Sequence, residues 1–373
     1  MGIAERLRYL VLDNGLSRWY AMRRWRDRRE RRDILRAYRE AAREVAPRNG
    51  DGTEIVVAPR NGDGTAAQRY PENVVCCLFE GFSEAGGLAD RLRGVVSVYQ
   101  ECKRRGLQMR LHFKHPFDLE LFMQPSEYDW RIQEDEICRD TRRSEVVVMR
   151  PLSDSYFTLR KQREWMRHFF DSLTKRKFGQ VHIYTNTPTA YGPEYGPLFR
   201  ELFKPTARLQ AALDGIQSQI GGQYISVSMR FLQLLGDFND VVDVGTTLSE
   251  EERKELINKC LKEIQKLHEA YPQHRVLVNS DSQRMLRAAR TLSYVYTIDG
   301  DIIHFDRSDG HEDEYKKFEK TFLDFLTISK ADEIFLIKCH HHMRESGFPH
   351  AAAMIGGHSS PVVRLCEEGV IRY

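Results

Sequence analysis

Three groups of side chains that can bind phosphate stand in the second half of the chain, each just after a run of residues typical of a β-strand. They are Arg230, the group Ser280, Asp281 and Ser282, and the group beginning at Ser346. Arginine matches phosphate oxygens with a planar fork, and serine hydroxyls can donate hydrogen bonds to them. Asp281 can instead accept from the N–H edge of a nucleobase. Singly these residues also occur in ordinary turns and ion pairs, but together they indicate a pyrophosphate site.

A glycine-rich segment over residues 80–94 (EGFSEAGGLADRLRG) follows the apolar run Val74–Phe79 and opens an amphipathic helix. A strand, a glycine turn and a helix N-terminus in this order present backbone N–H groups to a ligand, although such a turn can also simply reverse the chain. The residues of this loop that are candidates for ligand contact are Gly86, Gly87, Asp90 and Arg91.

Strand-like and helix-like patterns alternate along most of the chain. Strands are predicted over residues 74–79, 107–113, 144–149, 181–185, 223–231, 275–279, 292–298 and 333–338. Helices are predicted over residues 88–105, 116–125, 199–213, 249–267, 314–326 and 348–355, the fourth begun by a capping box of Ser249 and Glu252. This alternation predicts an α/β protein with mostly parallel sheets, whose ligands bind at the carboxyl ends of the strands.

A chain of 373 residues has room for two domains of ordinary size. We predict a basic amphipathic helix in residues 1–45, a linker over 46–70, an N-terminal lobe over 71–205 and a C-terminal lobe over 206–373. A nine-residue sequence that starts at Val45, next to the linker, recurs within it at Val57. Its Asn-Gly-Asp-Gly core lacks the terminal glutamate of a calcium loop, so the glycines are interpreted as turn residues.

The N-terminal segment is strongly basic, because residues 1–45 contain 13 Arg and no Lys against 7 Asp and Glu. With Trp19, Tyr20 and Trp25 among the arginines, the segment is of a kind that can lie at an anionic membrane surface. The favoured interpretation is that the helix packs on the globular body, with arginines covering apolar surface, and membrane contact is the second. Nucleic acid is the least favoured, and we expect no nucleic-acid partner.

The composition, with 41% hydrophobic and 30% charged residues, is that of a soluble globular protein, and no apolar run approaches the length of a membrane span. The first twenty residues contain no secretory apolar region, so we expect a cytoplasmic protein, peripheral at the membrane if the basic segment binds there. Seven cysteines without a Cys-x-x-Cys pair do not indicate a disulfide framework and are interpreted as small buried side chains.

The order of these motifs resembles the fucosyltransferase superfamily that includes nodulation and protein O-fucosyltransferases. The segments that carry the resemblance span residues 72 to 360 and include 80–94, the strand ending at Arg230 with Gly236 and Asp237 after it, 276–282, 322–332 and 346–352. The sequence departs from the family at Ser228, where a histidine two residues before the arginine is usual, and in the spacing to Gly236 and Asp237.

The resemblance implies a GT-B architecture of two Rossmann-like lobes and an inverting, metal-independent transfer of fucose from GDP-fucose to a glycan or lipid-linked glycan. It implies that Arg230 binds the leaving diphosphate and that Asp281 binds the guanine or ribose. Ser282, Ser346, Gly347 and Phe348 would contact the phosphates or the donor. No cofactor is implied, because the nucleotide sugar is the substrate. Gly86, Gly87, Asp90 and Arg91 would form the loop that faces the acceptor.

The general base stays open, since Asp90 and Glu84 both lie on the acceptor loop and either can simply cap the helix. Two metal motifs compete with the metal-free mechanism. Asp299-Gly-Asp301 has the form that holds a divalent ion, but a tight turn explains it better. The three histidines after Cys339 splay to different sides and lack zinc spacing. A non-catalytic nucleotide-binding or glycan-binding module, tethered by the basic helix, is the alternative function.

Overall fold

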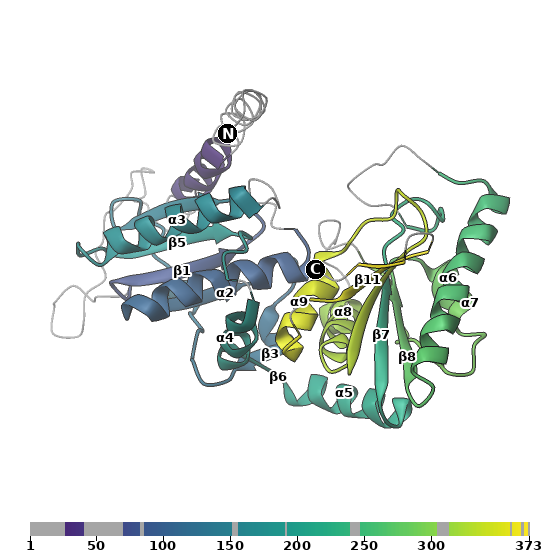
Figure 1. Ribbon diagram of the computed structural model, residues 1–373. Coiled ribbons are helices and arrows are strands. Elements are labelled where there is room, and N and C mark those ends of the chain that lie inside the picture. The colour runs from purple at the N-terminus through teal and green to yellow at the C-terminus, as the bar shows by residue number, and fades with distance from the viewer. Residues whose placement is uncertain are drawn as a thin grey trace, which may run out of the picture. The chain divides into compact units, whose positions relative to one another are not determined.

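The computed structural model describes residues 27–40, 70–82, 86–150, 156–190, 192–238, 247–303, 313–358, 360–366 and 369–371. Its contacts divide the chain into two compact units (Figure 1). Unit 1 contains residues 1–86, 91–115 and 129–190, and unit 2 contains residues 87–90, 116–128 and 191–373. Most of the predicted linker 46–70 lies outside the described residues.

Unit 1 is built on a four-stranded parallel sheet in the order β2-β1-β5-β4. These strands span, in chain order, Val74–Phe79 (β1), Gln108–Phe113 (β2), Ser144–Met149 (β4) and Gln180–Thr185 (β5). Every residue of β1 and β5 is buried, as expected for central strands that are covered on both faces. A 3-10 turn, η2 (Glu134–Glu136), precedes β4.

A helix over residues 27–40 covers one face of this sheet. Its Ile34 and Tyr38 are fully buried against alternate residues of β1, among them Cys76 and Leu78. This part of the predicted basic helix therefore packs on the globular body. Residues 1–26, which contain the tryptophans, lie outside the described residues, so membrane contact by that segment stays a prediction.

The two long helices of unit 1 are α2 (Leu88–Arg105) and α3 (Tyr156–Leu173). They are tied together by Arg105, which donates a hydrogen bond to the Asp171 carboxylate at 2.6 Å. A Cβ atom at Gly94 of α2 would lie 2.7 Å from the carbonyl oxygen of Thr185, at the end of β5. Only glycine permits this approach, which explains the last glycine of the glycine-rich segment.

A buried hydrogen-bonded chain joins helix 27–40 to the sheet. The Tyr38 hydroxyl lies 2.6 Å from Nδ1 of His182 and 2.9 Å from the hydroxyl of Tyr184. The His182 Nε2 donates to Oε1 of Gln180 at 2.8 Å, since that oxygen also accepts the Cys138 N–H. Burial lowers the pKa of His182 to about 4, so its imidazole is neutral at pH 7 and its Nδ1 accepts the Tyr38 proton.

Unit 2 contains a six-stranded sheet in the order β12-β11-β10-β7-β8-β9, parallel except for β12. The strands span, in chain order, Tyr224–Met229 (β7), Arg275–Ser280 (β8), Val295–Tyr296 (β9), Glu333–Lys338 (β10), Val362–Leu365 (β11) and Gly369–Ile371 (β12). The mostly parallel α/β architecture predicted from the sequence is therefore confirmed.

Helices lie on both faces of this second sheet (Figure 1). One side carries α6 (Glu250–Ala270) and α7 (Gln283–Ala289), whose apolar residues form a common core with Ile225, Val227 and Met229 of β7. The other side carries α5 (Ala207–Ile220), α8 (Glu314–Ile328) and α9 (Gly347–Gly356). The predicted capping box of α6 is present.

Three elements differ from the sequence prediction. The predicted bent helix over 199–213 is α4 (Tyr195–Leu202), a short strand β6 (Phe203–Pro205) and then α5, because β6 pairs with β3 (Met123–Pro125). The predicted helix over 116–125 is only the 3-10 turn η1 (Leu119–Leu121) before β3. The predicted strand 292–298 is reduced to β9.

The division between the units also falls earlier than the predicted residue 205. The turn η3 (Gly192–Glu194), α4 and β6 belong to unit 2 because α4 packs against α9. The Arg200 guanidinium donates to the carbonyl oxygen of Ile355 at 2.6 Å in this contact. Within the described part of the chain, no helix has the length and apolar character that a membrane span requires.

The Tyr38 chain gives a test of how firmly helix 27–40 is attached. Replacing Tyr38 by Phe would leave Nδ1 of His182 buried without a donor, which should lower the free energy of unfolding by about 1–3 kcal/mol. Urea denaturation of the full chain measures it. The control is Arg39→Gln, an exposed position on the same helix, which should change stability by less than about 0.5 kcal/mol. If the two substitutions lowered the free energy of unfolding equally, the Tyr38 hydrogen bond would not be what attaches the helix to the sheet.

Candidate functional site

Three loops of unit 2 meet at the carboxyl ends of neighbouring strands. Arg230 follows β7, Asp281 follows β8, and the segment with Arg344 follows β10. The carbonyl oxygen of Arg230 accepts the Arg344 N–H at 3.2 Å. The Asp281 carboxylate accepts the N–H groups of the two residues after Arg230, Phe231 at 2.8 Å and Leu232 at 2.9 Å. The half-buried Arg230 is therefore held by the loops on both sides of it.

Asp281 fixes a turn that would otherwise be unfavourable. Leu232 has a φ angle of +56°, in the left-handed region that side chains other than glycine seldom adopt. The hydrogen bond from its N–H to Asp281 stabilises this conformation. Burial raises the pKa of Asp281 to about 6, although the two N–H donors and the Arg230 charge oppose the rise. Both carboxylate oxygens are used within the protein, so binding of a base or ribose by Asp281 stays a prediction.

Ser282 uses its hydroxyl inside the protein. It caps α7 by accepting the Met285 N–H at 3.2 Å and donates its proton to Asp237 at 2.9 Å. Asp237 also accepts the Arg284 N–H at 2.7 Å, after a turn in which Gly236 has a φ angle of +72°. The Gly236-Asp237 pair thus joins the β7 loop to the start of α7. Phosphate binding by Ser282 would require the bond to Asp237 to break, and it stays a prediction.

Two helices, α7 and α9, begin at this edge of the sheet. The N-terminus of α9 is the more accessible, because its cap Ser346 is half-buried whereas Ser282 of α7 is fully buried. The Ser346 oxygen accepts the Phe348 N–H at 3.3 Å, and the first turn contains no acidic residue. Ser346, Gly347 and Phe348 are each half-buried, and the Phe348 ring packs 5.0 Å from that of Phe325. Helix N-termini of this kind favour anions through their N–H groups and dipole.

A buried ion pair beside this edge was missed by the sequence analysis. Lys320 donates to Asp324 at 2.5 Å within α8, and both side chains are at most 10% exposed. Burial raises the pKa of Asp324, opposed by Lys320 and by a hydrogen bond from Asn279, the penultimate residue of β8. The i, i+4 spacing of Lys320 and Asp324 on a predicted helix indicates an ion pair, but the same spacing is equally typical of a pair on the surface.

Arg91, which the sequence assigns to the acceptor-side loop, lies in the first turn of α2. Arg91 is 1% exposed, and its guanidinium donates to the carbonyl oxygens of Gly86 and His115, each at 2.8 Å. It therefore holds the loop in place, because a buried cation must satisfy its donors within the protein. Contact between Arg91 and an acceptor stays a prediction. Gly86 has a φ angle of +70°, which explains a glycine there, and Gly87 has open space around it. Asp90 is half-buried in the first turn of α2, where a carboxylate favours the helix dipole.

A charged cluster that the sequence analysis did not identify lies at the carboxyl end of β1. Glu80 accepts hydrogen bonds from the Tyr184 hydroxyl and from Arg139, each at 2.8 Å. Arg139 also pairs with Glu134, whose other oxygen lies 3.1 Å from Nε2 of His112. Burial alone would raise the pKa of Glu80, but the contacts with His112, Arg139 and Tyr184 outweigh it and lower the pKa to about 2.

The carboxylates of this cluster could in principle bind a metal ion, but Arg139 already neutralises them. Glu80, His112 and Glu134 are the one group within the described residues whose ligand atoms lie close enough together to share an ion. The Arg139 guanidinium already bridges the two carboxylates and supplies the balancing positive charge. A cation would have to displace Arg139, so the arrangement suits an internal ion pair better than a metal site.

The two metal motifs from the sequence have local partners. Asp299 pairs with Arg290 at 2.7 Å, and Gly300 has a φ angle of +123°, as in a turn. The rings of His340 and His341 stack with centroids 4.3 Å apart, and the His342 ring is tilted against them at 5.4 and 4.1 Å, so the three side chains do not splay apart as expected. Partial burial and the neighbouring histidines lower the pKa of His340.

Cys339 and Cys366 correct the cysteine prediction. They form a disulfide with Cα atoms 4.8 Å apart, while the other five cysteines are free and buried. The bond joins the residues that follow β10 and β11, which are neighbours only because these strands pair in parallel. The sequence did not indicate this disulfide, because the two cysteines are 27 positions apart.

We compared the sequence and the structure of the chain with those of known proteins. No family model and no curated protein matches the sequence. Among solved structures, the fucosyltransferase NodZ from Bradyrhizobium is 12% identical with a TM-score of 0.51, over 80% of this chain and 98% of that one. The chain has the fold of the GT-B fucosyltransferases. The fold predicted from the resemblance is therefore confirmed.

Two further structures of the same enzyme class are similar at lower scores. FUT1 from Arabidopsis thaliana, in complex with GDP, is 12% identical over 79% of this chain and 71% of that one, with a TM-score of 0.49. POFUT1 in complex with GDP-fucose is 13% identical over 77% of this chain and 96% of that one, with a TM-score of 0.42.

The Glu80 cluster predicts a defined loss of stability in acid. The folded-state pKa of Glu80 is lowered from its ordinary value of 4.5 to about 2, so its stabilisation is present above pH 4.5 and is lost as the pH falls towards 2. The contribution at pH 7 is on the order of 3 kcal/mol. Glu80→Gln should therefore be less stable at pH 7 and should lose less stability than the wild type on acidification. Urea midpoints of both proteins, measured between pH 7 and about pH 3, provide the test. If the midpoints of the wild type and of Glu80→Gln fell in parallel as the pH is lowered, the role assigned to Glu80 would be wrong.

Proposed function

We propose that this protein is an inverting, metal-independent glycosyltransferase that transfers fucose from GDP-fucose to a glycan or lipid-linked glycan acceptor. The observation that carries the proposal is Arg230, held at the carboxyl edge of the unit 2 sheet between the loops of β8 and β10. NodZ, whose fold the chain shares, is a fucosyltransferase, which supports a nucleotide-sugar donor. A sheet edge of this kind is where α/β proteins bind such ligands.

In this mechanism the acceptor oxygen attacks the anomeric carbon from the face opposite the diphosphate. The bond from that carbon to the phosphate oxygen breaks, the bond to the acceptor forms, and the acceptor proton passes to a base. Negative charge accumulates on the leaving diphosphate, and preorganised cations and N–H groups stabilise it. Arg230 and the N-terminus of α9, capped by Ser346, are assigned to this task.

Asp281 acts in the proposal as a positioning residue for Arg230. Its carboxylate binds the N–H groups that follow the arginine, so it fixes the backbone from which the guanidinium extends. The base is unassigned. Asp90 occupies the first turn of α2, and Glu84 lies outside the described residues.

A second candidate, a non-catalytic nucleotide-binding or glycan-binding module, is favoured by Ser228. The resemblance leads us to expect a histidine at this position of β7. Ser228 is 4% exposed, and its hydroxyl has no hydrogen-bond partner among the described residues. A short side chain so deeply buried does not replace a histidine contact with a ligand.

The two candidates are separated by GDP release. We expect the full-length protein to release GDP from GDP-fucose when a panel of glycan acceptors is added, and we expect EDTA to leave the rate unchanged. Saturable GDP binding without turnover on any acceptor would favour the binding module. Loss of turnover in EDTA that added Mg²⁺ restores would contradict the metal-free mechanism.

Arg230 should contribute strongly to this turnover. Arg230→Ala is expected to cost about 2.5–4 kcal/mol of transition-state stabilisation, a loss of two to three orders of magnitude in kcat, by comparison with removal of one preorganised donor. Arg287→Ala, which removes an exposed arginine from α7 in the same unit, is the matched control and should keep full activity. Turnover of Arg230→Ala within threefold of the wild type would refute the assignment.

A further inference from the structure

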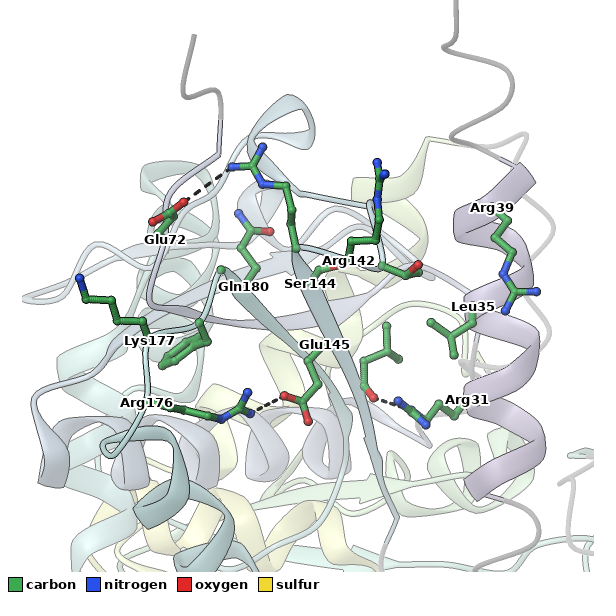
Figure 2. A pocket seen from close by; sticks show the side chains of 15 residues that line it. Arg31, Leu35, Arg39, Glu72, Arg142, Ser144, Glu145, Arg176, Lys177 and Gln180 are labelled. Atoms are coloured by element: carbon green, nitrogen blue, oxygen red, sulfur yellow. Dashed lines mark hydrogen bonds and ion pairs between the residues drawn. The ribbon is translucent and has the colours of Figure 1, made fainter. Parts of the chain in front are cut away.

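A basic groove of about 660 Å³ lies on unit 1, between helix 27–40 and the loops that lead into β4 and β5 (Figure 2). Figure 2 shows Arg31 and Arg39 along the helix side and Arg176 and Lys177 on the opposite side, with Glu145 between them. Of the fifteen residues that line the groove, six are cationic and two are acidic. The cations are Arg31, Arg39, Arg142, Arg143, Arg176 and Lys177. The groove therefore has a clear excess of positive charge.

Some of these cations are already engaged. Arg176 pairs with Glu145 at 2.5 Å, and Arg143 lies 3.7 Å from Glu72. Arg39 and Lys177 are both exposed, and neither has an ion pair or a hydrogen bond with any other residue that the structure describes. These two charges thus stand on opposite sides of the groove (Figure 2).

The groove is separate from the carboxyl edge of the unit 1 sheet. It is lined by Ser144 and Gln180, the first residues of β4 and β5, and so lies at the opposite ends of these strands from Glu80 and its cluster. Ligands of parallel α/β sheets bind at the carboxyl ends. The groove therefore lies at the edge opposite the one at which ligands of such sheets usually bind.

We propose that this groove binds the phosphate groups of an anionic membrane surface. Arginine and lysine at the rim of a surface attract anionic headgroups, and the volume of the groove suits a headgroup. Two features favour a membrane over a soluble polyanion. Leu35 and Phe178 add apolar area to the lining, and the bordering helix belongs to residues 1–45, whose 13 Arg and two Trp are the composition of an interfacial segment.

The test is vesicle sedimentation of the full-length protein with phosphatidylcholine alone and with phosphatidylcholine containing phosphatidylglycerol. We expect binding only to the anionic vesicles, weakened when the salt concentration is raised. The double variant Arg39→Gln and Lys177→Gln should bind about 30-fold more weakly, since each charge near an anionic surface contributes about fivefold. Because residues 1–26 are intact in this variant, a loss of that size assigns binding to the groove.

The control is the double variant Lys254→Gln and Lys262→Gln, which removes two exposed lysines from α6 of unit 2 and should bind like the wild type. Circular dichroism confirms that each variant is folded. Equal loss in both double variants, unchanged binding of the groove variant, or binding to phosphatidylcholine alone would overturn the proposal. Binding of soluble polyphosphate that Arg39→Gln and Lys177→Gln abolishes, without binding to anionic vesicles, would assign the groove to a soluble polyanion and overturn it as well.

Discussion

The position of the loop that carries Arg230 depends on one carboxylate, which joins the ends of two neighbouring strands. Asp281, at the end of β8, holds the backbone of residues 231 and 232 at the end of β7. Leu232 adopts a left-handed conformation that costs on the order of 1–2 kcal/mol, so the turn persists only because Asp281 satisfies its N–H groups. The direction in which Arg230 leaves the sheet follows from this contact, and the diphosphate chemistry assigned to Arg230 rests on it in turn.

In unit 1, too, a carboxylate at the end of a strand is held by groups from neighbouring elements. Its sheet end carries Glu80, whose charge is stabilised by Arg139, His112 and Tyr184 in a buried setting. Tyr184 lies beside Tyr38 of helix 27–40, so the helix and the strand end share one polar network. The helix is therefore joined to the strand end through directed polar contacts as well as through apolar packing.

The sequence was sufficient to predict the parallel sheets, the capping box at Ser249 and the carboxyl-edge position of Arg230, because strand burial and helix capping are local patterns. It was not sufficient for features that depend on pairing between distant strands. The disulfide of Cys339 with Cys366 and the β3–β6 pair that interrupts a predicted helix belong to this kind. The burial of Arg91 was missed for the same reason, since one of its two acceptors is the carbonyl of His115 beyond the next strand.

Helix 27–40 has a further consequence for β4, which is an outermost strand of its sheet. An outermost strand offers unpaired carbonyl and N–H groups to any extended peptide that meets it. Arg31 occupies one of these acceptors, the carbonyl oxygen of Val146, through its Nε at 2.8 Å. This contact removes one acceptor from the edge of β4, so a chain that lost the helix would offer one more group for strand addition by another copy.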